Sequence, residues 1–386
     1  MAFQPADRMN QFPESIFGKL KEAAAKKAAT GKELYDLSIG SPDLAPDQLV
    51  QDTLAKESSR NDAYGYTLGG IPAFQEAVAD YYKRRSQVQL NPETEILQTL
   101  GSQEGLIHLP LAFCNEEDIV LTTNPAYVAY DVGIKLANAK SYKMPLKEEN
   151  NFLPDLAAIP ESIAKKAKLL ILNLPGNPVP AMPTQNFFEE VVQFAKMHNI
   201  LVLHDAAYSE YYFEGDGPMS FLATPGAKDI GVEINSLSKS FSMAGARIAY
   251  IVGNDTAIRI MKDFKSNLDY GIFEPIQAAA VTALNNAETI TDRLRATFKE
   301  RHKLLTKGLQ DLGWKVAPSN GGMFIWAKYP NDLNDQDFVL KLIQETGVIM
   351  VPGSAFGSEG EGYVRIALVQ ENETLQRALQ ALKTFK

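Results

Sequence analysis

The sequence predicts an α/β fold, with a mostly parallel central sheet in a large domain and a smaller α+β domain. Between residues 95 and 252, strand-like and helical patterns alternate, which is typical of a parallel sheet covered by helices. Residues 200–205 form a nearly continuous apolar run, as expected for a strand buried on both faces. The length of 386 residues favours two domains. We place the large domain at 46–286 and form the small domain from 1–45 and 287–386.

The composition is that of a globular protein, with 45% hydrophobic and 22% charged residues. A net charge of −9 argues against nonspecific binding to nucleic acid or to an anionic membrane. The single cysteine, Cys114, excludes an internal disulfide and lies in an apolar run, which favours a buried structural thiol. Four scattered histidines lack metal-ligand spacing, so we expect no metal site. Without a signal-like N-terminus or a bilayer-spanning apolar run, we expect a cytoplasmic protein.

Caps, glycines and apolar periodicity predict the elements in order. The first helix is expected to end near Gly31, and Thr184 is a typical helix N-cap. Alternating charges over 291–312 predict a long helix that links the two lobes. The predicted helices cover 15–29, 72–84, 127–136, 187–197, 255–267, 276–286, 291–312, 335–346 and 371–385, with one more starting after Gly101. The predicted strands cover 34–39, 95–100, 118–122, 168–172, 200–205, 232–235, 247–252, 314–317, 323–327, 348–351 and 363–368.

A strand, a Gly-Ser pair and a helix start follow one another at Gly101-Ser102-Gln103. This order brings free backbone N–H groups and the positive end of a helix dipole together, which suits a phosphate. The segment lacks the further glycines of a dinucleotide fingerprint and the Gly-Lys-Ser/Thr ending of a P-loop. An ordinary strand-to-helix turn is the alternative.

Three other strand ends carry polar or aromatic residues that suit a ligand site. They are Tyr127 after the first, Asn177 after the second, and Asp205 with Tyr208 at the third. Because parallel strands end at one edge of a sheet, these residues are expected to lie together. Asn-Pro turns explain some of them equally well. Turn formation explains Asp205 less well, because burying a carboxylate at the end of an apolar strand costs free energy unless the carboxylate is paired.

The stretch from Ser236 to Arg247 places Lys239 in a loop of hydroxyls and small residues between two strands. A lysine that forms a Schiff base needs a partly desolvated position that lowers its pKa. Ser236 and Arg247 suit an anionic phosphate, because arginine offers a bidentate fork. A plain surface turn is one alternative. Another is a Ser-x-x-Lys acyl-transfer pair, Ser236 with Lys239, although its companion Ser-Asp-Asn and Lys-Thr-Gly motifs are absent.

Arg365 lies inside an apolar strand, residues 363–368. A buried arginine needs an anionic partner, which is either a substrate carboxylate or a carboxylate of the protein itself. The sequence leaves both alternatives open.

Together, the Ser-x-Ser-Lys loop, the arginine eight residues later, the Asp-x-x-Tyr strand end and the upstream Asn-Pro resemble a fold type I pyridoxal-phosphate aminotransferase. The resemblance covers essentially the whole chain and is strongest to the subgroup with LL-diaminopimelate and bacterial aspartate aminotransferases. Leu153-Pro154-Asp155-Leu156, Phe187-Phe188-Glu189-Glu190 and Lys265-Ser266-Asn267 are similar to that subgroup.

The resemblance implies a role for each candidate residue. Lys239 forms the Schiff base with the cofactor and moves the substrate proton, Asp205 pairs with the pyridinium nitrogen, and Tyr208 tunes the Schiff base. The implied cofactor-binding residues are Ser102, Gln103, Tyr127, Asn177, Asp205, Tyr208, Ser236, Ser238, Lys239, Arg247 and, from a partner subunit, Tyr66. The implied substrate-binding residues are Gly40, Asn177 and Arg365. Ala207 is the small residue on the ring face opposite Tyr127.

The resemblance therefore implies an enzyme of amino-acid metabolism that moves the amino group of an L-amino acid to a 2-oxo acid, acting as a homodimer. A β- or γ-eliminating C–S lyase would use the same lysine and aspartate. Two departures from the family pattern stand out. Val179-Pro180 replaces the usual Thr-Gly, and Tyr64 competes with Tyr66 for the partner's phosphate because the spacing to Gly70 is unusual.

Overall fold

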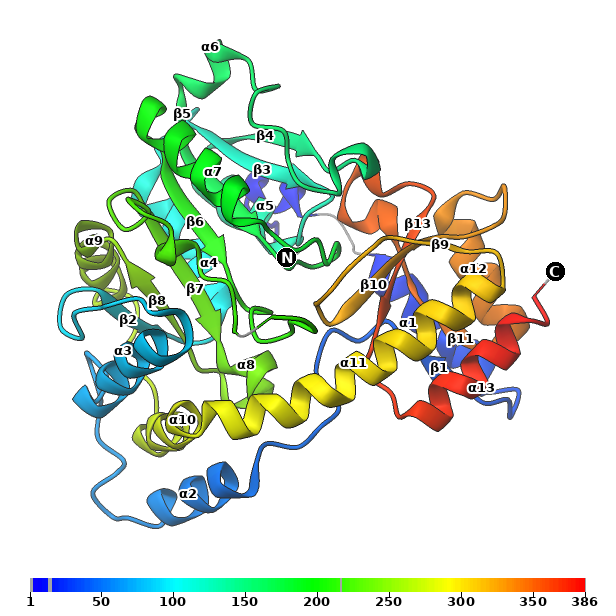
Figure 1. Cartoon of the computed structure of the whole chain (residues 1–386), viewed down its shortest axis with the longest axis horizontal. Helices are drawn as coiled ribbons and strands as arrows, with labels where there is room; N and C mark the ends of the chain where they lie inside the picture. The colour runs from blue at the N-terminus through cyan, green and yellow to red at the C-terminus, as the bar shows by residue number, and fades with distance from the viewer. Residues whose placement is uncertain (1–2, 13–15, 216, 386) are drawn as a thin grey trace.

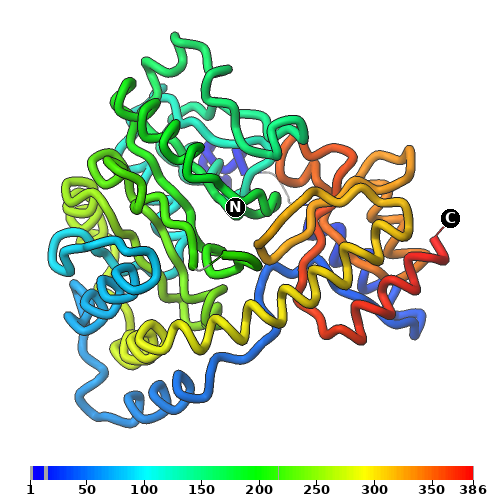
Figure 2. Tube along the Cα trace, in the orientation of Figure 1, coloured from blue at the N-terminus to red at the C-terminus, as the bar shows by residue number. Residues whose placement is uncertain are grey.

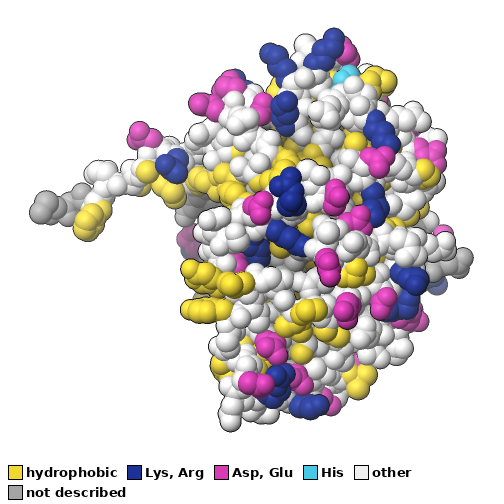
Figure 3. All heavy atoms as spheres, turned by 90° about the vertical axis from the view of Figure 1, so that its left-hand side faces the viewer, with side chains coloured by type: hydrophobic (Ala, Val, Ile, Leu, Met, Phe, Trp, Pro, Cys, Tyr) yellow, Lys and Arg dark blue, Asp and Glu magenta, His cyan; other side chains and the backbone are white. Residues whose placement is uncertain are grey.

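The computed structural model describes residues 3–12, 16–215 and 217–385. Two lobes lie side by side, and a long helix, α11 (Ala287–Asp311), runs from one to the other (Figures 1 and 2). Residues 3–12 extend from the body as an arm (Figure 3). No helix among the described residues is both long and apolar enough to cross a membrane.

The larger lobe contains a seven-stranded sheet in the order β2-β8-β7-β6-β5-β3-β4. The four neighbouring pairs from β4 at one edge through β3, β5 and β6 to β7 are parallel. Strand β8 runs antiparallel to both of its neighbours, β7 and β2. The mostly parallel sheet that the sequence predicts is therefore confirmed. The strands are β2 (Ile96–Thr99), β3 (Ile119–Asn124), β4 (Lys140–Pro145), β5 (Ala167–Asn173), β6 (Leu201–Asp205), β7 (Gly231–Ser236) and β8 (Ala249–Gly253).

Helices cover both faces of this sheet, because alternate strand residues point to opposite sides. On one face, Leu169 and Leu203 pack with residues of α4, α5 and α9. On the other, Leu170 and Val202 pack with residues of α3, α7 and α10. The helices of this lobe are α2 (Gln48–Ser58), α3 (Pro72–Ser86), α4 (Ser102–Phe113), α5 (Ala129–Leu136), α6 (Glu161–Ala164), α7 (Gln185–His198), α8 (Leu237–Ser240), α9 (Asp255–Lys265) and α10 (Glu274–Asn285).

The smaller lobe is built on an antiparallel sheet in the order β12-β13-β10-β9 and a parallel pair, β1-β11. Its separate core includes Tyr208 and Tyr211 from the loop after β6, so the two lobes meet at that loop. The elements are α1 (Ile16–Ala28), β1 (Tyr35–Asp36), β9 (Lys315–Val316), β10 (Phe324–Lys328), α12 (Asp335–Thr346), β11 (Val348–Ile349), β12 (Val351–Pro352), β13 (Tyr363–Ala367) and α13 (Asn372–Leu382).

The short 3-10 helices of the described residues, taken over both lobes, are η1 (Asp7–Gln11), η2 (Glu148–Asn150), η3 (Phe221–Ala223), η4 (Ala244–Ala246), η5 (Gly353–Phe356) and η6 (Ser358–Gly360).

The structure corrects several of the predicted elements. The predicted strand 348–351 is two short strands, β11 and β12, that belong to different sheets. The Lys239 stretch is a helical turn, α8, rather than a loop, and Ser236 caps it by accepting a hydrogen bond from the Ser238 N–H at 3.1 Å. Strand β4 and helix α2 were not predicted. Ser15, the predicted first residue of the first helix, lies outside the described residues. The domain limits at 45/46 and 286/287 stay a prediction.

Candidate active site

A cavity of about 540 Å³ lies where β5, β6 and β7 end, between the two lobes. All of the predicted site residues except Tyr66 line it. They come from seven regions far apart in the sequence: Gly40; Ser102 and Gln103; Tyr127; Asn177; Asp205 and Tyr208; Ser236, Ser238, Lys239 and Arg247; and Arg365. The cavity also includes residues that were not predicted, among them Phe17, Ser38, Ile39, Ser41, Val128, Asn173 and Phe356.

Lys239 extends from α8 into this cavity, where its amine donates a hydrogen bond to the Gly40 carbonyl. The pKa of Lys239 is lowered to about 8, mainly by burial and also by the nearby positive charges of Arg365 and Arg247, whereas the Asp205 charge opposes the shift. More of the amine is therefore neutral near pH 7 than in an exposed lysine, and the neutral amine is the form that attacks a carbonyl.

The Asp205 side chain is buried at the end of β6. Its carboxylate accepts hydrogen bonds from the Tyr130 hydroxyl at 2.8 Å and from the Ala207 N–H at 3.2 Å. Burial raises the pKa of Asp205, and these two hydrogen bonds oppose the rise because they favour the charged form. The sequence missed Tyr130, a helix residue that reads as an ordinary core tyrosine.

Two asparagines connect the ends of β5 and β6. Asn173 donates from its amide to the Asp205 carbonyl at 2.7 Å and accepts from the Asn177 N–H at 2.8 Å. The Asn177 side chain is thereby held in the cavity, next to Tyr208. Burial raises the pKa of Tyr208, and a hydrogen bond with Asn177 opposes that rise.

Arg365 comes from β13 of the small lobe, and only 4% of it is exposed. It donates to Oδ1 of Asn177 at 2.8 Å and to the Ser38 carbonyl at 2.5 Å, while its Nε has no hydrogen-bond partner. The guanidinium lies over the rings of Phe324 and Phe356, 4.5 and 5.0 Å from their centroids. Burial lowers the pKa of Arg365 to about 10.

No carboxylate of the described residues forms an ion pair with Arg365. Of the two alternatives that the sequence left open, an internal salt bridge is therefore not what the described part of the chain contains. A buried cation without a counter-ion, facing a cavity, fits an anionic ligand group.

A second anion-binding arrangement lines the same cavity. Gly101 precedes α4 with φ +79°, and no side chain caps the helix, so its first N–H groups are left for a ligand. A Cβ at Gly101 would lie 2.2 Å from Nη2 of Arg247, so only glycine lets the guanidinium approach the helix start. Ser102 and Ser236 line the same region.

Tyr127 and Ala207 both line the cavity, and burial raises the pKa of Tyr127. Tyr66, by contrast, lies outside it and is 83% exposed, with its ring 5.1 Å from that of Tyr270. The hydroxyl of Tyr64 donates to the carbonyl of Ser58 in the same chain at 2.8 Å.

Comparisons with known proteins agree with this geometry. Residues 32–382 match the family model described as aminotransferase class I and II. The chain belongs to the class I and II aminotransferases. This family uses pyridoxal 5′-phosphate, so the enzyme is a pyridoxal-phosphate-dependent aminotransferase and the Ser-x-x-Lys acyl-transfer interpretation is wrong.

Among its relatives, the aminotransferase is 40% identical to the LL-diaminopimelate aminotransferase of Aquifex aeolicus, over 100% of both chains. A substrate-bound structure of BacF from Bacillus subtilis has a TM-score of 0.93 and 35% identity, covering 99% of this chain and 98% of that one. A probable N-succinyldiaminopimelate aminotransferase from Thermus thermophilus has a TM-score of 0.90 and 36% identity, covering 96% of this chain and 99% of that one.

The residues of this aminotransferase fit the cofactor. The Gly101 approach to Arg247, the uncapped start of α4 and the hydroxyls of Ser102 and Ser236 suit a phosphate. Asp205 offers a buried carboxylate to a ring nitrogen, and Lys239 offers an amine of lowered pKa.

Proposed function

We propose that the enzyme transfers the α-amino group of LL-diaminopimelate to a 2-oxo acid. The observation that carries the substrate part of this proposal is Arg365, a buried guanidinium that faces the cavity without a carboxylate partner among the described residues. An amino acid and a 2-oxo acid both carry the α-carboxylate that this fork fits.

In this proposal each cavity residue has one task. Arg365 binds the substrate carboxylate and so orients the Cα–H bond, and Lys239 removes the proton at Cα. When bound, pyridoxal phosphate supplies the electron sink that makes this proton acidic. Asp205 would hold a proton on the ring nitrogen of the bound cofactor, and Asn177 and Tyr208 would hydrogen-bond its ring oxygen. Proton removal by Lys239 is favoured by its pKa of about 8, because a base with a pKa near the working pH is the most effective.

The phosphate is held, in this proposal, by the N–H groups at Ser102 and Gln103, the hydroxyl of Ser236 and the Arg247 fork. Ser238 supports this end of the site, since its N–H fixes the Ser236 hydroxyl. Tyr127 and Ala207 enclose the ring from its two faces. The Gly40 segment covers the substrate.

LL-diaminopimelate is proposed as the donor because it is the substrate named for the Aquifex relative. The test is a titration of the purified, yellow enzyme with LL-diaminopimelate, L-aspartate, L-glutamate and L-phenylalanine in turn, without a 2-oxo acid. We expect LL-diaminopimelate to bleach the visible band at the lowest concentration, and a 2-oxo acid to restore it.

Three other outcomes are informative. Bleaching by a different amino acid would leave transamination in place and overturn the donor. Release of ammonia with no need for a 2-oxo acid would favour the C–S lyase alternative. A band that none of the four amino acids changes would overturn the proposal.

We also propose that the enzyme is a homodimer in which Tyr66 reaches the partner's phosphate. Exposed aromatic and aliphatic side chains gather on two neighbouring loops beside the start of α4, as the Tyr64–Phe273 and Tyr66–Tyr270 ring contacts at 5.2 and 5.1 Å indicate. Such a patch is typical of an interface. Tyr66 is favoured over Tyr64, whose hydroxyl already donates within its own chain.

Mixing two variants that are each expected to be impaired tests this arrangement. A hybrid of Tyr66→Phe and Lys239→Ala subunits contains one site with both groups intact, so mixing is expected to restore part of the activity. Failure of the mixture, with dimers demonstrated by sedimentation, would overturn the assignment of Tyr66.

A further inference from the structure

The four residues that follow Tyr208 leave the cavity and enter the protein interior. Glu210 and Tyr211 are fully buried, each 0% exposed. Neither lines the cavity, yet both lie within six residues of Asp205 along the chain. A buried glutamate and a buried tyrosine hydroxyl need strong hydrogen-bond partners, so the partners of these two residues are informative.

The Tyr211 hydroxyl donates a hydrogen bond to the main-chain carbonyl of Lys239 at 2.9 Å. That carbonyl lies near the end of α8, where carbonyls lack partners within the helix. Main-chain donors to this carbonyl are the N–H groups of Phe241, which also bonds the Leu237 carbonyl, and of Ser242, at 3.4 Å. Tyr211 therefore supplies a short side-chain hydrogen bond to the main chain of the catalytic lysine.

The Tyr211 ring is held in turn by α11. It packs edge-on against Phe298 of that helix, with the ring centroids 4.8 Å apart at 86°. The Tyr211 carbonyl accepts from the N–H of Gly322 at 2.6 Å, in the small lobe. The tyrosine thus joins the lysine turn of the large lobe to two elements that do not contact the cofactor site.

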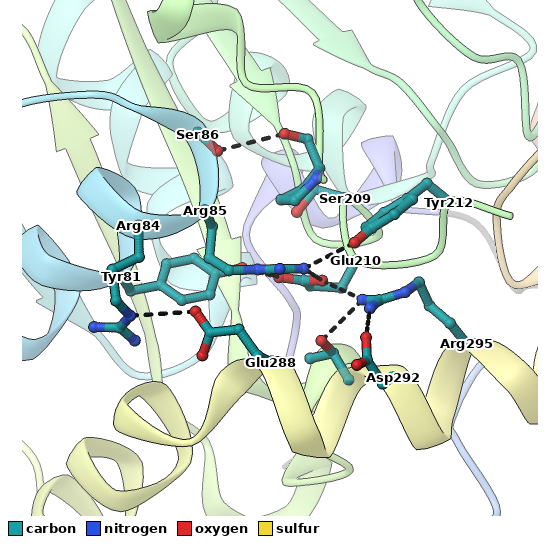
Figure 4. A network of polar contacts seen from close by, with 12 residues as sticks. Tyr81, Arg84, Arg85, Ser86, Ser209, Glu210, Tyr212, Glu288, Asp292 and Arg295 are labelled. Carbon is teal, nitrogen blue, oxygen red and sulfur yellow. Dashed lines mark hydrogen bonds and ion pairs between the residues drawn. The ribbon is translucent and has the colours of Figure 1, made fainter. Parts of the chain in front are cut away.

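Glu210 fixes the main chain beside Tyr211 (Figure 4). Its carboxylate accepts from the Tyr81 hydroxyl at 2.6 Å, from Arg85 at 2.7 Å and from Arg295 at 2.9 Å. Tyr81 and Arg85 belong to α3 and Arg295 to α11, so this one carboxylate connects three elements.

Tyr212, on the other side of Tyr211, is held by the same two arginines. Its hydroxyl accepts from Arg85 at 3.0 Å, and the Arg295 guanidinium lies 4.3 Å from its ring centroid. With the residues on both sides anchored, Tyr211 has little freedom to move.

We infer that Tyr211 is a positioning residue for Lys239: its hydroxyl fixes the carbonyl of the α8 turn, and the Glu210 cluster with Arg85 and Arg295 holds Tyr211 in place. The amine of Lys239 is attached to this turn by a four-carbon chain, so a small rotation of the turn displaces the amine. A misplacement of about 1 Å lowers an enzymatic rate by up to about 100-fold. This inference rests on the assignment of Lys239 as the catalytic lysine.

The test is Tyr211→Phe, which removes only the hydroxyl. Tyr329→Phe is the matched control, because the Tyr329 hydroxyl also donates to a main-chain carbonyl, that of Leu333 at 2.6 Å, in the small lobe. We expect Tyr211→Phe to lower kcat by about 10- to 100-fold with KM little changed. In the cofactor-free protein, we expect faster amide hydrogen exchange over residues 237–243 for this variant and not for the control.

Glu210→Gln tests the second half of the inference, because it keeps the size of the side chain and removes its charge. Faster exchange over both 208–212 and 237–243 is expected. The inference is overturned if Tyr211→Phe leaves either kcat or exchange over 237–243 as in the wild type, or if Glu210→Gln leaves 237–243 unchanged. A Lys239→Ala variant distinguishes failure of the proposed function from failure of this inference. Activity in Lys239→Ala would refute the assignment of the lysine. Amide exchange in the cofactor-free protein, by contrast, reports on Tyr211 alone.

Discussion

The Arg365 guanidinium donates to Oδ1 of Asn177 at 2.8 Å, so the residue proposed to bind the substrate carboxylate directly contacts the residue proposed to bind the cofactor ring. One comes from the small lobe and the other from the loop after β5 of the large lobe. The hydrogen bond makes the position of the substrate carboxylate dependent on the relative placement of the two lobes.

Arg365→Lys is expected to raise the KM for the amino donor by about 100-fold, with a smaller effect on kcat. Lysine keeps the charge but loses the planar fork, and a hydrogen bond to a charged group contributes roughly 1.5–3 kcal/mol. Steady-state kinetics measure the change. The control, Arg377→Lys, alters an exposed arginine paired with Glu33 and should behave as the wild type. An unchanged KM in Arg365→Lys would refute the carboxylate assignment.

Lys239→Met is expected to change how stability depends on pH in the cofactor-free protein. The pKa of Lys239 is lowered from 10.5 to about 8 in the folded state, mainly by burial. Below pH 8 the folded protein must bury a charged amine, which destabilises it. Between pH 8 and 10.5 Lys239 is mostly protonated in the unfolded state and mostly neutral in the folded state. The free energy of unfolding of the wild type therefore rises with pH over this range. Lys239→Met should lack the rise and should be the more stable protein at pH 7. Chemical denaturation across this range provides the measurement, and parallel curves would contradict the prediction.

Tyr130→Phe is expected to lower kcat by about 3- to 10-fold, because one hydrogen bond of about 1 kcal/mol to the Asp205 carboxylate is lost. That hydrogen bond lowers the pKa of Asp205, so its removal raises the pKa and should move the acid limb of the rate profile to higher pH. Tyr82→Phe serves as the control, since its hydroxyl donates to a different buried carboxylate, Glu233, at 2.7 Å. A pH profile identical to that of the wild type would show that Tyr130 does not act on Asp205.

Gly101→Ala is expected to weaken pyridoxal phosphate binding by at least about 10-fold, because the Gly101 backbone (φ +79°, ψ 161°) lies in an essentially glycine-only region that costs alanine roughly 1–3 kcal/mol, and because the new methyl displaces Arg247. Equilibrium titration of the cofactor-free protein gives the affinity. Gly245→Ala is the control, since a Cβ there meets nothing within 4 Å. Equal affinities for both variants would exclude a phosphate position at Gly101.

The sequence alone predicted the parallel sheet and most of the cavity lining, because both depend on local signals. Apolar runs mark the central strands, and polar residues at their ends share one edge of the sheet. Edge strand β4 escaped prediction because five of its six residues are exposed or half-buried, which leaves no apolar run. Helix α2 escaped for a similar reason, with only Val50 buried.

Hydrogen-bond and ion-pair partners that lie far apart in the sequence could not be predicted either. The sequence around Tyr130 does not indicate its hydrogen bond to a residue 75 positions away. Likewise, the sequence around Arg365 does not indicate whether a carboxylate of the protein pairs with it. Asn173 was passed over because Asn-Pro turns nearby explained the segment. The helical turn at Lys239 differs from the loop that the sequence predicts because α8 has only four residues, too few for a periodic pattern.

Two of the cations that line the cavity, Lys239 and Arg365, also hold the same short piece of main chain. Lys239 donates to the carbonyl of Gly40, and Arg365 donates to that of Ser38. A ligand that engages either side chain competes with this main chain for the same N–H groups. In the proposed mechanism, cofactor attachment at Lys239 and carboxylate binding at Arg365 each release a hydrogen bond to residues 38–40, so this segment thermodynamically links the two events.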